Sequence, residues 1–211
     1  KIALARCEKV VVQSEFNKAC VMNNFSLPED KIELIRAHGD MSESKDPPAA
    51  RILMVGEFRY KKGHEILLAA LKKLNRKDIV VWFVGGGYLD VRGIARDMGL
   101  EDQTVFLGMV GKDMLNILYE ACDFLVLPSR TAPDGDMEGI PAVLMEAMSH
   151  SKPVISTRHA GIPELVEEIL IDENDIDALA SAIERLVEDP ELRMRLGKRN
   201  FEIVKTSFSD D

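Results

Sequence analysis

Short runs of apolar residues recur along most of the chain, and each run is continuous rather than alternating with polar positions. They are residues 52–55, 79–84, 105–107, 124–127, 154–156 and 169–171. Continuous apolar runs are typical of parallel strands that are covered on both faces. Helical periodicity lies between them, at residues 64–74, 91–98, 113–121 and 142–149. This alternation predicts an α/β fold, a Rossmann-like doubly wound parallel sheet with right-handed crossovers.

The first residues follow a different pattern. Val10–Val12 is a short apolar run, a helix is expected from Ser14 to about Asn24, and residues 32–35 form a second short run. Residues 39–50 are polar, contain two consecutive prolines and have no periodicity, which indicates a linker. We therefore expect a separate domain to end within residues 1–36, a linker at 37–50, and one domain at 51–211. Asn174 or Asp175, and then Asp189 followed by Pro190, are expected to begin two terminal helices.

Composition narrows the possible functions. The 46% hydrophobic content suffices for a real core, and the net charge of −9 argues against a nucleic-acid partner. The three cysteines are too few and too scattered for a disulfide framework or a zinc cluster. No apolar run approaches the roughly 20 residues of a membrane span, and the first residues show no signal-peptide pattern. A cytoplasmic protein is expected, and docking of the full-length protein on the inner membrane face is left open.

The stretch after the 124–127 run carries the clearest candidate chemistry. Glu138 and Glu146 lie eight positions apart, separated by Gly139, Ile140, Pro141 and the start of an apolar helix. Ligands of open α/β sheets bind outside the carboxyl ends of the strands, and a helix N-terminus there favours a phosphate. The alternative is that Glu146 is a solvated helix residue and Glu138 merely an anion at a helix start.

Other candidates follow strands in the same way. Lys62 lies between the 52–55 run and the next helix, where it is either a phosphate-binding cation or a solvated loop lysine. Gly85 and Gly87 either leave room for a ligand or allow close packing of a tight turn. His64 is expected to be structural, and His159 is weighed equally between function and structure. Asp134 and Asp136 fit shaping of the loop better than a metal pair.

A family resemblance rests on these residues. Glu138-Gly139-Ile140-Pro141, followed by residues 144–148, resembles the E-x7-E signature of retaining nucleotide-sugar glycosyltransferases with the GT-B architecture. The resemblance covers about residues 32–208 and includes 55–63, 84–87, 105–108, 121–129, 152–157 and 161–164. The sequence of residues 132–141 and 156–159 is similar to that of enzymes that build bacterial exopolysaccharides of the colanic-acid type. The resemblance implies the C-terminal, donor-binding half of such an enzyme.

The resemblance also implies roles for individual residues. Glu138, facing the donor sugar, and Lys62, on the diphosphate, would be the catalytic pair, and Glu146 would bind the ribose hydroxyls. The remaining donor-binding positions would be Gly139, Ile140, Pro141, Gly56, Arg59, Gly85, Gly87, Leu107, Ser129 and His159. The donor would be a UDP- or GDP-sugar, with no cofactor and no metal.

Glu57 departs from the family pattern, which has arginine directly after the glycine at position 56. A glutamate there would repel phosphate, so Arg59 or Lys61 would have to supply the charge, or donor binding is weakened.

The function expected from the resemblance is transfer of a hexosyl group with retention to a glycan or lipid-linked acceptor. The acceptor would be held by an N-terminal domain of which this chain has only the end, so the chain alone should bind nucleotide but turn over poorly. Two alternatives stay open. One is a nucleotide-sugar epimerase of the same architecture, and the other is a non-catalytic nucleotide-binding module.

Overall fold

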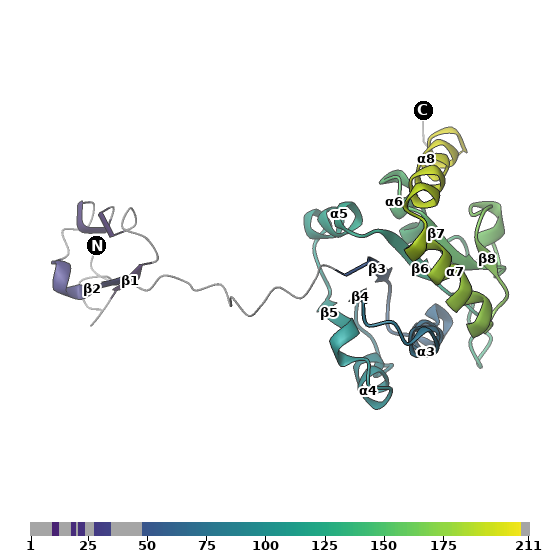
Figure 1. The fold of residues 1–211 in the computed structure, drawn as a ribbon, viewed down its shortest axis with the longest axis horizontal. Coiled ribbons are helices and arrows are strands. Elements are labelled where there is room, and N and C mark those ends of the chain that lie inside the picture. Colours follow the sequence, from purple (N-terminus) through teal and green to yellow (C-terminus); the bar gives the residue numbers. More distant parts are fainter. Residues whose placement is uncertain (1–9, 13–17, 20, 24–27, 35–47, 208–211) are drawn as a thin grey trace. The chain divides into compact units, whose positions relative to one another are not determined.

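The computed structural model describes residues 10–12, 18–19, 21–23, 28–34 and 48–207. The chain divides into two compact units, Lys1–Asp46 and Pro47–Asp211 (Figure 1). In the smaller unit, β1 (Val10–Val12) pairs in parallel with β2 (Ile32–Leu34), which follows the 3-10 turn η1 (Glu29–Lys31). Residues 18–19 and 21–23 are helical. Both predicted strands are thus confirmed, whereas the expected helix cap Ser14 lies outside the described residues.

The larger unit contains a parallel sheet of six strands in the order β5-β4-β3-β6-β7-β8. The strands are β3 (Ala50–Val55), β4 (Ile79–Val84), β5 (Thr104–Gly108), β6 (Phe124–Leu127), β7 (Val154–Thr157) and β8 (Leu170–Ile171). This confirms the predicted Rossmann-like sheet. The strand expected at 52–55 begins earlier because Ala50, fully buried, pairs with Ile79. The strand expected at 169–171 begins at Leu170.

Helices cover the sheet on both faces (Figure 1). They are α3 (His64–Leu74), α4 (Val91–Asp97), α5 (Lys112–Ala121), α6 (Ala142–Ser149), α7 (Ile176–Glu188) and α8 (Pro190–Ser207). The connections contain three 3-10 turns: η2 (Tyr60–Lys62) between β3 and α3, η3 (Glu101–Gln103) between α4 and β5, and η4 (Ile162–Glu164) between β7 and β8. Helix α3 packs against α7, and α6 packs against α8.

Capping side chains explain where several helices begin. The carboxylate of Asp175 accepts a hydrogen bond from the Ala178 amide at 2.8 Å, and Asp189 accepts one from the Leu192 amide at 2.8 Å. Each bond satisfies a helix N–H group that has no partner within the helix. The predicted starts of α7 and α8 are therefore confirmed.

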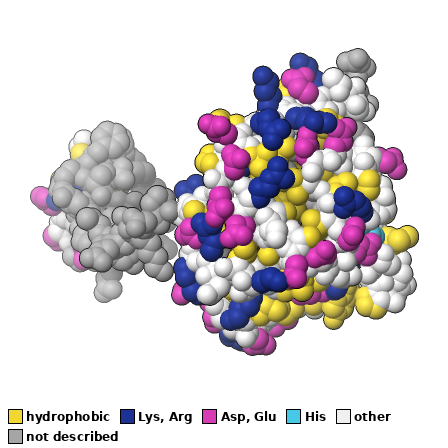
Figure 2. Space-filling model, turned by 45° about the vertical axis from the view of Figure 1, so that its right-hand side comes forward, with side chains coloured by type: hydrophobic (Ala, Val, Ile, Leu, Met, Phe, Trp, Pro, Cys, Tyr) yellow, Lys and Arg dark blue, Asp and Glu magenta, His cyan; other side chains and the backbone are white. Residues whose placement is uncertain are grey.

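The core of the larger unit lies between the sheet and its helices, and its largest fully buried side chains include Tyr119, Phe83 and Phe124. Cys122 is a free, buried thiol, and burial raises its pKa to about 12. Among the described residues, no helix is both long and apolar enough to cross a lipid bilayer. Acidic and basic side chains are interspersed on the face of the larger unit shown in Figure 2.

Candidate functional site

The order of the strands in the sheet changes direction where β3 and β6 meet. From β3 the chain moves through α3 to β4 on one side, whereas β6 pairs with β3 on its other side. The sheet therefore has its topological switch point between β3 and β6, which is the usual ligand position in open α/β sheets. The loop after β3 and the loop of residues 128–141, which joins β6 to α6, lie at this point. Most of the predicted site residues lie in these two loops.

Glycines hold the loops together by allowing backbone-to-backbone contact. A Cβ atom added at Gly63, whose φ is 71°, would lie 2.0 Å from the carbonyl oxygen of Pro128. A Cβ at Gly85, whose φ is 137°, would lie 2.0 Å from the carbonyl oxygen of Gly56. Both positions therefore require glycine. For Gly85, close packing is sufficient to explain the residue.

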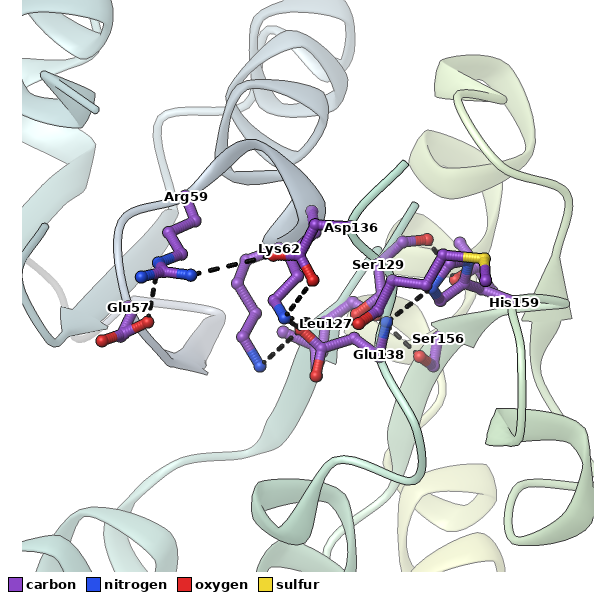
Figure 3. Close-up of polar contacts among 12 residues, drawn as sticks. Glu57, Arg59, Lys62, Leu127, Ser129, Asp136, Glu138, Ser156 and His159 are labelled. Atoms are coloured by element: carbon purple, nitrogen blue, oxygen red, sulfur yellow. Dashed lines mark hydrogen bonds and ion pairs between the residues drawn. The ribbon is translucent and has the colours of Figure 1, made fainter. Parts of the chain in front are cut away.

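The two predicted catalytic residues form an ion pair. Lys62 Nζ lies 3.0 Å from Glu138 Oε1, and their side chains are only 13% and 10% exposed (Figure 3). The stem of Lys62 passes over Gly56, where a Cβ atom would come within 3.3 Å of the lysine Cδ and Cε. The structure thus brings Lys62, Glu138 and Gly56 together beside the switch point.

A second set of charges continues outward from this pair. Arg59 Nε lies 2.9 Å from Glu57, and its Nη1 lies 3.7 Å from Asp136 (Figure 3). Lys61 Nζ lies 3.0 Å from Asp136 and 3.9 Å from Glu138. Arg59 is therefore paired with two carboxylates. Together with Lys62, these residues form what we call the charge cluster, in which three cations face three carboxylates.

Asp136 is held in the 128–141 loop by its ion pairs with Arg59 and Lys61. Besides its ion pairs, its backbone amide donates a hydrogen bond to the carboxylate of Asp134 at 3.1 Å. Among the described residues, no group of three or more His, Cys, Asp or Glu side chains could hold a metal ion. That donor binding needs no metal remains a prediction.

Glu146 is held by a residue that the sequence did not single out. The hydroxyl of Tyr119, on α5, donates a 2.7 Å hydrogen bond to Glu146 Oε2, and the tyrosine ring stacks on His150. Burial raises the pKa of Tyr119, and the Glu146 carboxylate raises it further, so the phenol remains a donor. Glu146 itself is exposed. Helical periodicity could place Tyr119 in the core, but only the fold pairs it with α6.

His159 contacts the 128–141 loop at Glu138 and is 1% exposed. Its Nε2 accepts a hydrogen bond from the Glu138 amide at 3.1 Å (Figure 3). Its Nδ1 lies 2.5 Å from Glu173 Oε1. Burial works to raise the pKa of Glu173, but hydrogen bonds from the Thr131 amide and from His159 leave it lowered. Sequence reasoning missed Glu173, because its partners are distant in the chain.

His64, the other histidine considered, is fully buried at the start of α3. Its ring packs edge-on against Phe58 at 4.9 Å and lies 6.0 Å from Phe83, as expected for a structural residue. Burial lowers its pKa to about 4, a backbone contact of Arg59 opposes this, and the charge of Lys62 lowers it further. His64 is therefore uncharged at neutral pH.

The remaining predicted residues lie around these groups. Ser129 is fully buried, and its carbonyl accepts a hydrogen bond from the Thr157 hydroxyl. Gly139 is exposed with no atom within 4 Å of an added Cβ, and Ile140 packs near Gly161. Pro141 is the N-cap of α6, and the helix begins at Ala142 and ends at Ser149, as predicted.

A pocket of about 420 Å³ lies beside the switch point, at the carboxyl ends of β4 and β5. Its lining includes Phe58, Phe106 and Gly108 with the turn of residues 85–92, so it contains Gly85 and Gly87. The guanidinium of Arg92 lies 4.8 Å from the centre of the Phe106 ring. Neither Glu138 nor Glu146 lines this pocket, and Leu107, 38% exposed, does not line it either. The predicted residues thus fall into neighbouring groups rather than one cavity.

Sequence comparison identifies related proteins. Residues 40–202 match the model of the family described as glycosyl transferases group 1. The chain is 32% identical over 176 residues to a protein named as a colanic acid biosynthesis glycosyltransferase, WcaL, of Escherichia coli, covering 77% of this chain and 43% of the relative. It is 38% identical over 144 residues to the amylovoran biosynthesis glycosyltransferase AmsK of Erwinia amylovora, covering 64% and 35%. The chain therefore spans less than half the length of these relatives.

Solved structures show the same fold. The C-terminal domain of a group 1 glycosyl transferase, LpcC, from Francisella tularensis superimposes with a TM-score of 0.68 at 21% identity, covering 78% of this chain and 89% of that one. Anabaena HepE in complex with UDP gives a TM-score of 0.67 at 22% identity, covering 99% and 62%. The fold is thus that of the GT-B glycosyltransferases. With the family match over most of its length, the chain belongs to the group 1 glycosyl transferases.

Proposed function

We propose that the larger unit binds a nucleotide diphosphate sugar where β3 and β6 meet. The full-length protein would transfer the hexosyl group, with retention, to a hydroxyl of a glycan or lipid-linked acceptor. Support comes from relatives named for colanic acid and amylovoran biosynthesis and from a structural neighbour that is complexed with UDP. The acceptor site would belong to other parts of the full-length protein.

The Lys62–Glu138 ion pair is the observation that carries this proposal. A largely buried cation that is paired with a carboxylate three residues before the N-cap of α6 suits a diphosphate, because an ammonium group and the amides at a helix start both attract negative charge. Negative charge on the diphosphate grows as the bond between the anomeric carbon and the phosphate oxygen breaks. Lys62 would therefore stabilise the transition state more than the bound donor.

The donor must displace Glu138 from Lys62 to bind in this way. The freed carboxylate would then face the sugar, where it can accept hydrogen bonds from hydroxyl groups. In retention on the leaving-group face, the acceptor oxygen bonds to the anomeric carbon as the diphosphate departs. The acceptor proton passes to the departing phosphate oxygen, so this step needs no carboxylate nucleophile.

The nucleoside would extend from the diphosphate toward the other two groups of residues. Glu146, fixed at one oxygen by the Tyr119 hydroxyl, can accept hydrogen bonds from both ribose hydroxyls. The pocket beside Gly85 and Gly87 is large enough for a base. Uridine and guanosine are both compatible with these features.

Isothermal titration calorimetry on the full chain tests the proposal. UDP, GDP and their glucose and mannose conjugates would be titrated at fixed ionic strength, with UMP and ribose 5-phosphate as controls. We expect one diphosphate to bind and Lys62→Ala to weaken it at least about tenfold, since a charge-assisted contact is lost. Lys198→Ala, a substitution in α8, is the matched control and should leave binding unchanged. Equal affinity for parent and Lys62→Ala would refute the site.

A second candidate, a non-catalytic nucleotide-binding module, is favoured by one observation. Glu57 stands where the resembled family has arginine, and its ion pair with Arg59 occupies a cation that could otherwise bind phosphate. Transfer of radiolabelled sugar by the full-length protein separates the candidates. Binding without transfer or donor hydrolysis would select the module.

A further inference from the structure

Hydrogen bonds connect Thr131 and Glu138, two residues of the 128–141 loop, to the carboxylate of Glu173. The connection from Glu138 passes through His159. Glu173, which follows β8, accepts a 2.9 Å hydrogen bond from the Thr131 amide through Oε2. Its Oε1 lies 2.5 Å from His159 Nδ1, and His159 Nε2 is 3.1 Å from the Glu138 amide. A single carboxylate therefore holds Thr131 directly and Glu138 through the imidazole.

The chemistry of these contacts fixes the state of the histidine. A backbone amide can only donate, so His159 Nε2 must carry a lone pair. The hydrogen is then on Nδ1, which donates to the Glu173 carboxylate. A carboxylate behind a histidine is a common way to select one tautomer and hold the ring in one orientation. The ring is 1% exposed, so water offers little competition for either contact.

Packing around the ring supports the same arrangement. Ala160 has a φ of 45°, in the left-handed region that is unfavourable for alanine, so its neighbours must hold it there. A Cβ at Gly161 would lie 2.9 Å from Ile140 Cγ1 and 3.4 Å from the carbonyl oxygen of Gly139. The turn that carries His159 is therefore docked directly against the two residues after Glu138.

We propose that His159 and Glu173 are positioning residues for sugar transfer, which fix the backbone at Glu138 so that its carboxylate and the 139–140 amides meet the donor correctly. This inference rests on the proposed function. Neither residue touches the donor in this scheme. His159, which the resemblance assigns to donor binding, instead acts through Glu138, and Glu173 acts through His159.

A matched pair of substitutions separates the two contacts of the ring. Glutamine at position 159 can place its amide oxygen where Nε2 lies, so His159→Gln keeps an acceptor for the Glu138 amide and loses the bond to Glu173. Asparagine is one methylene shorter and can place its amide nitrogen where Nδ1 lies. His159→Asn therefore keeps the bond to Glu173 and loses the acceptor for Glu138. Both replacements are polar and remove the ring.

Three measurements on the chain would be combined with kinetics of the full-length protein. Amide hydrogen exchange reports the Glu138 N–H bond directly, and nitrogen chemical shifts of the imidazole report the tautomer, both without any donor. Calorimetry with the nucleotide sugar that the parent binds reports function, and donor kcat and KM would be measured on the full-length protein. Glu173→Gln is the second variant, because it keeps the size of the side chain but leaves one acceptor oxygen for two donors, the Thr131 amide and His159 Nδ1–H.

We expect the parent to show the Nδ1–H tautomer and a protected Glu138 amide. His159→Gln should keep donor affinity within about threefold, whereas His159→Asn should lose protection at Glu138 and at least about tenfold in donor affinity and kcat. Glu173→Gln should fall between the two. Equal losses in both His159 variants would overturn the inference and reduce His159 to a packing residue, even where the parent binds the donor. A parent that binds no nucleotide would overturn the proposed function and the positioning role with it.

Discussion

Replacing Glu138 by glutamine removes the anion that occupies Lys62 in this structure, and the expected effects on stability and on nucleotide binding have opposite signs. At 3.0 Å and an effective dielectric constant near 20, the attraction between the two charges is about 5 kcal/mol. Much of this offsets the cost of removing both groups from water. Breaking a buried pair costs about 3–5 kcal/mol, and the residual exposure of 13% and 10% favours the lower end.

We therefore expect Glu138→Gln to lower the free energy of unfolding by about 3 kcal/mol, which corresponds to a fall in Tm of roughly 6–12 °C for a domain of this size. The affinity for UDP or GDP should rise about tenfold, or 1.4 kcal/mol, because the diphosphate no longer competes with a carboxylate for Lys62. The nucleotide should also raise the Tm of the variant more than that of the parent.

Thermal unfolding and calorimetry at low and high salt measure both effects. The double variant Lys62→Ala/Glu138→Gln is the control, because without the lysine the gain in nucleotide affinity should vanish. Transfer by the full-length protein should fall in Glu138→Gln despite the tighter nucleotide, since the carboxylate is assigned to the sugar. Unchanged or weaker nucleotide binding by Glu138→Gln would refute the idea that this anion and the diphosphate share one cation.

Three further substitutions test other parts of the structure. Gly85→Ala should lower the free energy of unfolding by about 2–4 kcal/mol in denaturant titration, because the new Cβ would collide with the backbone of Gly56. Gly86→Ala should change it by no more than about 0.5 kcal/mol, because no atom lies within 4 Å of a Cβ added there. Similar losses in the two variants would contradict this. Tyr119→Phe should weaken UDP binding about tenfold by releasing Glu146, but should leave binding of 2′,3′-dideoxy-UDP unchanged in calorimetry. His64 has a folded pKa of about 4 against roughly 6.5 unfolded, so its stabilising effect is complete above pH 6.5 and is lost as pH falls toward 4. Between pH 7 and 5 the parent should lose about 2 kcal/mol more than His64→Leu in urea titrations, and parallel pH profiles would contradict this.

Much of the fold could be predicted because its signals are local. The continuous apolar runs identify all strands of the larger sheet, and α3 begins and ends at the predicted residues. Strand ends were less accurate. Ala50 belongs to β3 because of its pairing with Ile79, and no pattern within the polar segment before it indicates that contact.

The same distinction between local signals and long-range contacts applies to the candidate site. The loops that carry Lys62 and Glu138 were predicted because each directly follows a strand, and parallel strands bring such loops to one edge of the sheet. The partners that orient the acids, Tyr119 and Glu173, could not be predicted. Their contacts join segments that are 27 and 14 or more residues apart, and a single tyrosine or glutamate has no local pattern.

The ion pair between Glu57 and Arg59 was also beyond sequence reasoning. From the sequence, Glu57 in place of arginine is expected to repel phosphate. In the structure, Glu57 also forms an ion pair with Arg59, two positions later. Whether this weakens donor binding stays a prediction, and calorimetry of Glu57→Arg tests it, with tighter nucleotide binding as the expected result.

The backbone contacts at Gly63 and Gly85 have a consequence for anyone who wishes to change the donor preference of such an enzyme. The segments after β3, β4 and β6 touch through main-chain atoms, with no side chain between them to absorb a change in length or path. Grafting one of these segments from a relative would therefore disturb the segment that its backbone touches, and the segment after β3 touches both of the others. A transplant of all three segments together is the smallest exchange that preserves their fit.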